Sequence, residues 1–425
     1  MSQDTYRTTV RELSDEIIDA QGPIRVLNAI KWDDQIRERF FESGFEEQPE
    51  VGPHYYESRP LGFDPSDLRD RFRALVRNIR AQLGPVSPAG TLMRFMCEQF
   101  RLVIDMLEAR GTPAFAELSG LLYGTPRDVF HVGGPTVLDL SDTLRSTLDA
   151  IAASMMEIEE PRTIPGSEAV RLLQQRLDRS MGPGRIDVRL DDGIVADAAA
   201  GASYIKMRAD RDFSERDLAV LEAHEGWIHV GTTQNGLAQP VCSFLGKAAP
   251  RTTVTQEGLA VLTELLNIKS HPRRIQRIMR RVEGISLAAD GAAFIDVFRS
   301  FREDGAADEE AWQLSSRIFR GCPPEAGPFT KDLGYSKGLV LTYVYVRMAI
   351  RLGRVQRIPM LFCGKVDLQD LGVLHQLYDE GLVDPPPFVP PPFDDLPSLA
   401  STLAFSRFQS QLDYDRLEAD YIRII

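Results

Sequence analysis

Apolar residues recur at helical spacing along the first third of the chain. A helix is predicted from Pro65 to Leu83, because Asp64 can cap it, proline occupies its first position and Gly84-Pro85 follows it. One face carries the apolar residues Leu68, Phe72, Leu75, Val76, Ile79 and Leu83. Similar patterns predict helices over about 92–109, 113–124, 141–157 and 167–182. Since short turns separate the first three helices, we expect an N-terminal helical layer packed through these faces.

The pattern changes in the middle of the chain. Residues 185–190 and 203–208 alternate between polar and apolar, with a turn at Asp191-Asp192-Gly193, as expected for strands of a small sheet. Residues 231–250 contain glycine, threonine and proline and are predicted to form a loop. Further helices are predicted over about 294–302, 312–319, 339–352 and 368–381. The whole pattern indicates a mainly helical α+β fold.

Candidate catalytic residues lie in the segment His224-Glu225-Gly226-Trp227-Ile228-His229. The helix that carries it is predicted to begin at Ser214, a capping residue followed by acidic residues in the first turn. Zinc hydrolases commonly have two histidines four residues apart, with a glutamate beside the first. Here the histidines are five apart, about 140° on a regular helix, so their rings would point apart. We therefore predict a local widening such as a π-turn, which Gly226 makes easier.

A second motif, Gln256-Glu257-Gly258-Leu259-Ala260, supplies the candidate third ligand, Glu257, on a helix capped by Thr253 or Thr255. Two imidazoles and one carboxylate leave a position around Zn²⁺ for water, as in catalytic rather than structural zinc sites. Glu225 is the candidate general base, which takes a proton from water and passes it to the leaving amine. The alternative is that the two histidines are hydrogen-bonded core residues. The remaining histidines are isolated and are expected to be surface or core residues: His54, His131, His271 and His375.

Together the two motifs resemble the bacterial flavohaemoglobin expression-modulating QEGLA-motif proteins and their eukaryotic relatives, the microtubule-associated tyrosine carboxypeptidases. Weaker support comes from Asp192-Gly193-Ile194, Phe213-Ser214-Glu215 and Phe329-Thr330-Lys331-Asp332, and the resemblance extends over about residues 20–384. It implies a zinc metallopeptidase with atypical histidine spacing. In that family pattern the metal ligands are His224, His229 and Glu257, and the catalytic base is Glu225. Trp227 departs from the small aliphatic residue expected in the eukaryotic relatives, so the resemblance does not carry over a side-chain preference.

Four further residues are candidate substrate contacts. Lys206 lies on a predicted strand that could pair with extended substrate, and the Arg251 guanidinium could hold a C-terminal carboxylate. Lys331 or Tyr335 could donate a hydrogen bond to the oxyanion. For each residue the alternative is a solvated charge or another structural role. A solvated helix face, or alternatively a surface for an acidic protein partner, is expected from Arg273, Arg274, Arg277, Arg280 and Arg281.

Composition narrows the functional classes. The chain has 425 residues, of which 43% are hydrophobic and 26% charged, as in globular proteins. Its net charge of −13 argues against non-specific nucleic-acid binding. Four scattered cysteines without C-x-x-C spacing indicate reduced thiols in a cytoplasmic protein. No signal peptide is visible, and the most apolar run, about 13 residues including Arg347, is too short for a membrane span, so no membrane partner is expected.

These observations predict an N-terminal helical region over 1–158, a metallopeptidase catalytic region over 159–384, and a proline-rich linker with a C-terminal tail over 385–425. The predicted function is zinc-dependent hydrolysis of a peptide bond by a carboxypeptidase-like enzyme acting on a peptide or protein C-terminus. Two alternatives stay open: a regulatory or binding protein with a structural metal site, and a zinc hydrolase acting on a non-peptide amide. Glu225 favours an enzyme, because a structural site needs no base and usually closes its fourth position with a protein group.

Overall fold

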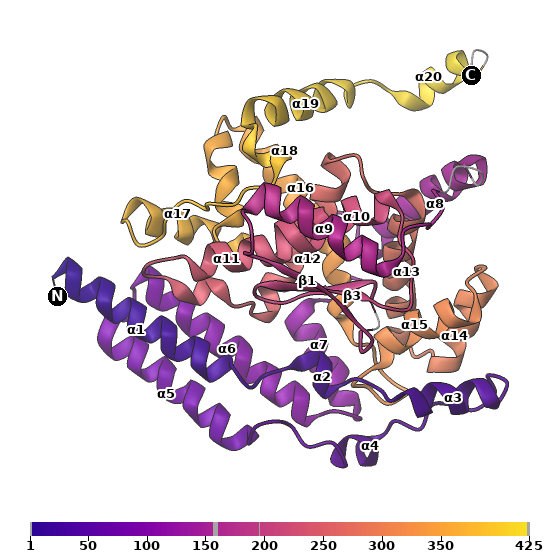
Figure 1. Ribbon diagram of the computed structural model, residues 1–425, viewed down its shortest axis with the longest axis horizontal. Helices are drawn as coiled ribbons and strands as arrows, with labels where there is room; N and C mark the ends of the chain where they lie inside the picture. Colours follow the sequence, from indigo (N-terminus) through magenta and orange to yellow (C-terminus); the bar gives the residue numbers. More distant parts are fainter. Residues whose placement is uncertain (1, 156–159, 195, 423–425) are drawn as a thin grey trace.

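The computed structural model describes residues 2–155, 160–194 and 196–422. Helices dominate and one small sheet lies in the middle of the chain, so the predicted mainly helical α+β class is confirmed (Figure 1). The first part contains α1 (Gln3–Gln21), α2 (Val26–Ala29), α3 (Asp34–Glu42), α4 (Pro53–Glu57), α5 (Pro65–Leu83), α6 (Pro88–Glu108), α7 (Pro113–Tyr123) and α8 (Val137–Met155). The middle part contains α9 (Gly166–Met181), β1 (Asp187–Asp191), β2 (Ala198–Ala200), β3 (Tyr204–Arg208), α10 (Glu215–Leu221), η1 (Glu222–Val230), α11 (Gly231–Leu237), η2 (Ser243–Gly246), α12 (Pro250–Leu266), α13 (Pro272–Ala289), α14 (Phe294–Glu303) and α15 (Asp308–Phe319). The last part contains η3 (Thr330–Asp332), α16 (Leu333–Arg351), η4 (Val355–Phe362), η5 (Leu368–Asp370), α17 (Leu371–Asp379), α18 (Pro391–Asp394), α19 (Leu396–Gln409) and α20 (Tyr414–Tyr421).

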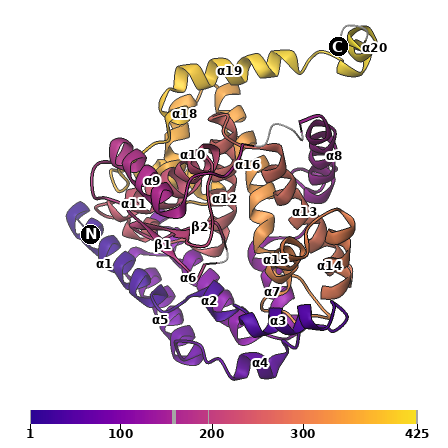
Figure 2. The ribbon, with the colours of Figure 1, turned by 45° about the vertical axis from the view of Figure 1, so that its right-hand side comes forward.

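The N-terminal layer is built from α1, α5 and α6, which pack on one another (Figures 1 and 2). α5 begins where the sequence predicts, because the Asp64 side chain accepts a hydrogen bond from the backbone N–H of Asp67. It ends at Gly84, whose φ of 81° is accessible to glycine without strain. The first residues form a helix that buries Val10 and Ile17 in the main hydrophobic cluster, so they are part of the layer.

The largest hydrophobic cluster joins this layer to the second half of the chain. It contains Phe72 from α5 and Phe100 from α6 together with Leu259 from α12 and Phe362 from η4. The N-terminal helices therefore support the element that carries the candidate ligand Glu257. The predicted boundary at residues 158 and 159 lies outside the described residues, so the division into three regions stays a prediction.

The sheet has the strand order β1-β3-β2, with β1 parallel and β2 antiparallel to the central strand. The two strands predicted at 185–190 and 203–208 are confirmed as β1 and β3, with Val188 paired to Ile205, but β1 begins at Asp187 and includes Asp191, which was predicted to lie in the turn. Their buried side chains form a separate hydrophobic cluster with Leu177 of α9 and Leu218 of α10. The sheet thus packs against α10, which leads into the histidine segment, and against α9.

Residues 231–250 do not form the predicted loop, because α11 and η2 occupy much of this stretch. Glycine and threonine are weak helix formers, so tertiary contacts must stabilise α11. The Asn235 side-chain amide donates a hydrogen bond to the backbone oxygen of Phe362. Gly236 packs so closely on Leu245 that a Cβ would lie 2.2 Å from its backbone oxygen. The prediction was wrong because α11 is held by a hydrogen bond to the distant Phe362 and by close backbone packing within the segment itself.

α12 begins earlier than predicted, with Ala249 as its N-cap. The two threonines expected as caps lie inside the helix, and the Thr255 hydroxyl accepts a hydrogen bond from the backbone N–H of Leu368. α12 crosses α16 at Gly258 and Gly338, where a Cβ on the first glycine would lie 2.0 Å from the carbonyl carbon of the second. The two backbones therefore touch beside Glu257, with no side chain between them.

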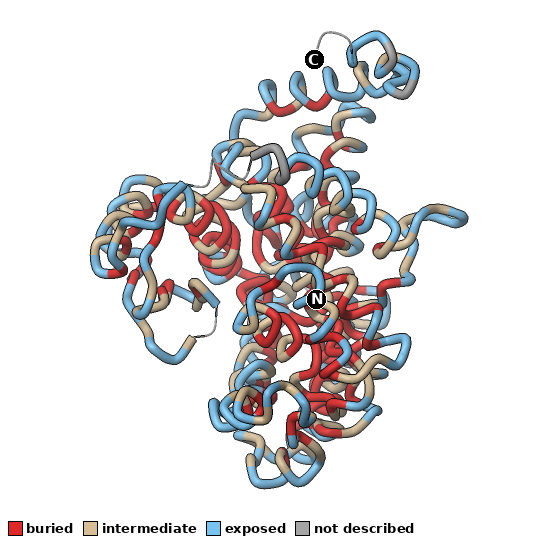
Figure 3. Tube along the Cα trace, turned by 90° about the vertical axis from the view of Figure 1, so that its right-hand side faces the viewer, coloured by how far each residue is buried: buried red, intermediate tan, exposed pale blue. Residues whose placement is uncertain are grey.

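The C-terminal helices α19 and α20 extend away from the body of the molecule (Figure 1). The proline-rich segment leads to Phe393, whose ring centre lies 4.9 Å from that of Phe362. Leu399 and Leu403 attach α19 to the main hydrophobic cluster, and Figure 3 shows mostly exposed positions towards the C-terminus. Within the described part of the chain, no helix combines the length and apolar character needed to cross a bilayer.

Candidate metal centre

The histidine segment forms a wide helix. Ser214 and Asp217 form a capping box at the start of α10, which continues directly into the π-helix Glu222–Val230. The predicted widening is confirmed, and it extends over nine residues rather than a single turn. Because π-helical hydrogen bonds join residues five apart, His224 and His229 lie about one turn apart. Their ring centres are only 4.8 Å from each other.

Gly226 lies between the two histidines and faces α9. A Cβ at this position would lie 2.5 Å from Cδ2 of Leu177. Glycine therefore lets α9 pack directly against the wide helix, in addition to the backbone freedom that the sequence suggested.

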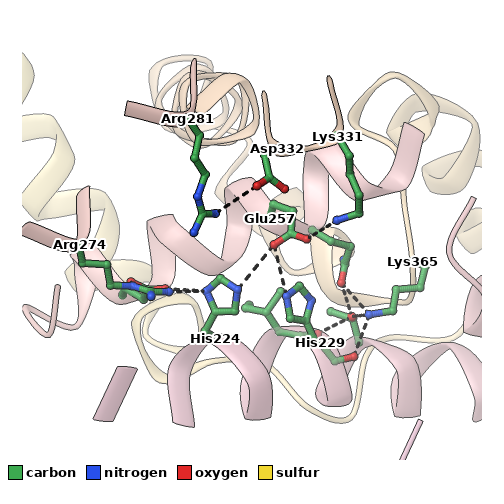
Figure 4. Close-up of polar contacts among 12 residues, drawn as sticks. His224, His229, Glu257, Arg274, Arg281, Lys331, Asp332 and Lys365 are labelled. Carbon is green, nitrogen blue, oxygen red and sulfur yellow. Dashed lines mark hydrogen bonds and ion pairs between the residues drawn. The ribbon is translucent and has the colours of Figure 1, made fainter. Parts of the chain in front are cut away.

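Glu257 of α12 reaches the space between the two imidazoles (Figure 4). Its Oε2 atom lies 3.6 Å from Nε2 of His224 and 3.5 Å from Nε2 of His229, and it is buried without a hydrogen-bond partner among the described residues. Ligand atoms placed tetrahedrally around one zinc ion at 2.0–2.2 Å lie roughly 3.4 Å from one another. The three side chains therefore fit a single metal ion, with all their ligand atoms within 4.8 Å.

The other nitrogen of the first histidine is fixed by a buried carboxylate. Nδ1 of His224 lies 2.6 Å from Oε1 of Glu264, and Arg274 Nε donates a 2.6 Å hydrogen bond to Oε2 of the same carboxylate. Burial alone would raise the pKa of Glu264, but the Arg274 guanidinium lowers that pKa to about 2. An ionised Glu264 accepts a hydrogen bond from Nδ1–H, so the unprotonated Nε2 is left to face Glu257. Both glutamates lie on one face of α12, because they are seven residues apart.

Two of the four predicted substrate contacts lie beside this centre. Lys331 Nζ is 3.2 Å from Oε1 of Glu257. Tyr335, one turn further on, stacks its ring on His224 with the ring centres 6.2 Å apart. Burial would raise the pKa of Glu257, but Lys331 and the two histidines hold it well below its ordinary value. Glu257, the third candidate ligand, is therefore anionic and is oriented from both sides.

A family model described as "Microtubule-associated tyrosine carboxypeptidase" matches residues 38–411. The chain belongs to this family. Membership indicates a carboxypeptidase-like hydrolase with a protein or peptide as its substrate, and it confirms the relation to these carboxypeptidases that the two motifs suggested. A crystal structure described as a lipoprotein from Colwellia psychrerythraea is similar at 14% identity and a TM-score of 0.44, covering 73% of this chain and 66% of that chain. No curated protein matches the chain.

The other two predicted substrate contacts, Lys206 and Arg251, each form an ion pair with a carboxylate away from the centre of this carboxypeptidase-family protein. Lys206 Nζ lies 2.6 Å from Oδ2 of Asp191, so the charge of this β3 residue is paired across the sheet. Arg251 Nε lies 2.6 Å from Oδ2 of Asp367, and its guanidinium covers the ring of Phe95 at 4.5 Å. Neither residue lines the cavity beside the centre. Both side chains are therefore engaged in ion pairs outside this cavity, and their roles as substrate contacts stay predictions.

A cavity of about 690 Å³ opens beside His224, Glu225 and Tyr335. Glu225 is half-buried and borders this space directly. Among the described residues, eight arginines and five carboxylates line the cavity. The lining is thus locally basic, although the whole chain carries a net charge of −13. A pocket of this kind attracts anionic groups.

Five of these arginines come from α13, which was expected to present a solvated face. That expectation holds for Arg273 and Arg277, which are exposed. It is wrong for Arg274 and Arg281, whose side chains turn towards the centre and contact Glu264 and Asp332 respectively. The seven-residue spacing of these two arginines places them on one helix face, and this was the signal available in the sequence.

Glu264 and Lys365 are residues at the centre that the sequence did not indicate. Lys365 Nζ donates hydrogen bonds to the backbone oxygen of His229 at 2.8 Å, to the Thr232 hydroxyl at 3.0 Å and to Oε1 of Gln256 at 2.9 Å. Three acceptors match the three donors of an ammonium group. Lys365 therefore ties the end of the π-helix to the residue that precedes Glu257. An isolated lysine more than a hundred residues from either motif gave no sequence signal.

Proposed function

We propose that this chain is a zinc-dependent metallocarboxypeptidase in which His224, His229 and Glu257 hold the zinc ion and Glu225 is the general base. The observation that carries the proposal is the buried Oε2 atom of Glu257, which has no hydrogen-bond partner in the described part of the chain and faces both Nε2 atoms at 3.5 and 3.6 Å. Two imidazoles and one carboxylate are a ligand set of catalytic zinc. When bound, zinc lowers the pKa of a water molecule and polarises a substrate carbonyl.

Glu225 supplies the proton transfers in this proposal. It follows a candidate ligand directly and borders the cavity, so its carboxylate can take a proton from the attacking water and return it to the leaving amine nitrogen. Tyr335 is the candidate oxyanion donor. Burial raises the pKa of its phenol, which keeps the O–H available as a hydrogen-bond donor near His224. Lys331 is instead the partner of Glu257, because its ammonium is already paired with that carboxylate.

The substrate class follows from the charge of the cavity. Its excess of arginines over carboxylates supports a peptide that presents anionic groups, either at its terminus or on acidic side chains. The peptide character itself follows from family membership.

The direct test is to incubate purified protein, with and without added zinc, with a library of C-terminally varied peptides and to identify the products by mass spectrometry. Glu225→Gln is expected to keep the metal and lose hydrolysis, while Glu257→Ala is expected to lose the metal itself. Glu222→Gln is the matched control, because Glu222 lies in the same π-helix but faces Arg176 at 3.8 Å and does not line the cavity.

Two results would overturn the proposal. Unchanged turnover by Glu225→Gln removes the base from the mechanism, and full zinc occupancy in Glu257→Ala removes the third ligand. Retained metal without hydrolysis of any peptide would instead favour a binding protein with a structural metal site.

A further inference from the structure

Two arginines of the cavity wall, Arg281 and Arg317, contact the same carboxylate, that of Asp332. Asp332 offers a single buried carboxylate, and Arg317 occupies both of its oxygens, with Nε at 2.7 Å and Nη2 at 3.0 Å. Arg281 reaches the same carboxylate only through Nη1, at 3.6 Å from Oδ2 (Figure 4). Two guanidinium groups therefore share one carboxylate, and one positive charge lacks a full partner.

The under-paired group is Arg281. Its side chain is only 15% exposed, and its Nε–H has no hydrogen-bond partner among the described residues. A buried guanidinium with unused donors is unfavourable unless an anion completes its pairing. Since Arg281 lines the cavity, a ligand entering that space can supply the anion.

Arg281 is also close to the catalytic centre. Its guanidinium carbon lies 5.2 Å from the centre of the Tyr335 ring, and that ring stacks on His224. An anionic group bound by Arg281 is therefore one aromatic ring away from a candidate metal ligand. This is the position for the end of a short peptide segment whose last amide bond lies at the centre.

The other arginines on this side of the cavity are differently placed. Arg274 is fully engaged with both oxygens of Glu264. Arg277 is paired with Glu310 at 2.8 Å, and its side chain is 47% exposed. These charges attract an anionic peptide at a distance. Among the described arginines that line the cavity, only Arg281 has a buried N–H donor without a hydrogen-bond partner.

We propose that Arg281 is the residue that binds the C-terminal α-carboxylate of the substrate. The inference rests on the proposed function. A guanidinium offers two parallel N–H donors to a carboxylate, which gives both charge and orientation. The anchor fixes the last residue of the peptide in the cavity and places the amide bond before it at the candidate zinc site. An internal peptide segment lacks the α-carboxylate and leaves Arg281 unpaired.

The test compares binding of one acidic peptide as its free acid and as its C-terminal amide, measured by fluorescence anisotropy. All proteins carry Glu225→Gln and zinc, so no turnover is needed. We expect the free acid to bind about 10- to 100-fold more tightly than the amide, as for a hydrogen bond to a charged group. Arg281→Met should bring the free acid down to the affinity of the amide, and Arg281→Lys should restore part of the difference.

Arg277→Met is the matched control on the same helix. It should weaken binding of acid and amide by the same factor, because its charge acts at longer range, and so leave their ratio unchanged. Thermal unfolding checks the fold of each variant. Arg281→Met is expected to have an equal or higher Tm, because Asp332 keeps its two hydrogen bonds from Arg317.

An unchanged acid-to-amide ratio in Arg281→Met, or in Arg281→Lys should the first variant not fold, would overturn the assignment. It would also be overturned if amidation has no effect while Glu→Gln exchange inside the peptide abolishes binding, because Arg281 would then bind an acidic side chain. Failure of the proposed function is distinguishable, since it appears as absence of cleavage in the zinc-loaded wild type, whatever the binding ratio.

Discussion

The close crossing of α12 and α16 explains why the motif at residues 256–260 contains Gly258. In Gly258→Ala, the new Cβ would lie 2.0 Å from the carbonyl carbon of Gly338 and 2.2 Å from its oxygen. Ordinary contact begins near 3.4 Å, so the two helices must separate locally by about 1.4 Å. Glu257 is the neighbouring residue, and Lys331 lies just before α16, so the separation acts directly on their 3.2 Å contact.

The expected loss of stability follows from two opposing effects. Forcing extra volume into a close-packed interface costs about 1–3 kcal/mol, and a clash between backbones is at the upper end because no side chain can rotate away. Replacing a glycine inside a helix by alanine stabilises that helix by about 1 kcal/mol. We therefore expect Gly258→Ala to lower the free energy of unfolding by about 2 kcal/mol and to weaken metal retention, measured by thermal or urea unfolding and by chelator competition.

Gly334→Ala provides the control on the same pair of helices. A Cβ there would lie 3.5 Å from Cα of Val254 and 3.7 Å from Cγ of Glu257, which are ordinary contacts. This variant should be as stable as the wild type or about 1 kcal/mol more stable. If Gly258→Ala matches Gly334→Ala in both stability and metal affinity, close packing at the crossing is not the reason for the motif glycine.

Two further predictions concern ionisable groups. Glu264→Gln should reduce zinc affinity about 10- to 100-fold in chelator competition, because the carboxylate that orients His224 loses its charge, and an unchanged affinity would exclude this role. Burial and the neighbouring Asp367 raise the pKa of Asp370 from 3.8 to about 6 in the folded protein. As the pH rises, this carboxyl group therefore loses its proton in the unfolded chain before it does so in the folded protein. The free energy of unfolding consequently falls between these two pH values. In Asp370→Asn this fall should disappear, giving about 1 kcal/mol more stability than the wild type above pH 6 and no difference below about pH 4, as measured by Tm across pH.

Several elements were predictable because their signals are local. The Asp64 cap, the proline after it and the apolar stripe define α5 within a single segment of chain. The capping residue Ser214 likewise defines the start of α10. The five-residue spacing of the histidines was informative for the same reason: a regular helix would separate two rings that share a metal, so the backbone had to widen.

Helix α11 shows where local signals fail. Its glycines and threonines predict a loop, yet the Asn235 side chain donates hydrogen bonds to the backbone oxygens of Phe362 and Phe388, more than a hundred residues later in the chain. Packing contributed by distant segments outweighs a propensity difference of less than 1 kcal/mol per residue.

The charged residues show most clearly what the sequence determined and what only the tertiary structure determined. The sequence by itself determined the helical layers, the small sheet, the wide helix and the identities of the candidate ligands, because caps, periodicity and spacing act within a few residues. Only the tertiary structure decided that Arg251 is paired with Asp367 and that Lys365 bonds to the end of the π-helix. It also decided that Arg281 lines the cavity with an Nε–H that has no hydrogen-bond partner among the described residues. The role of a charge depends on which opposite charges surround it, and those partners are brought together by folding from positions far apart in the chain.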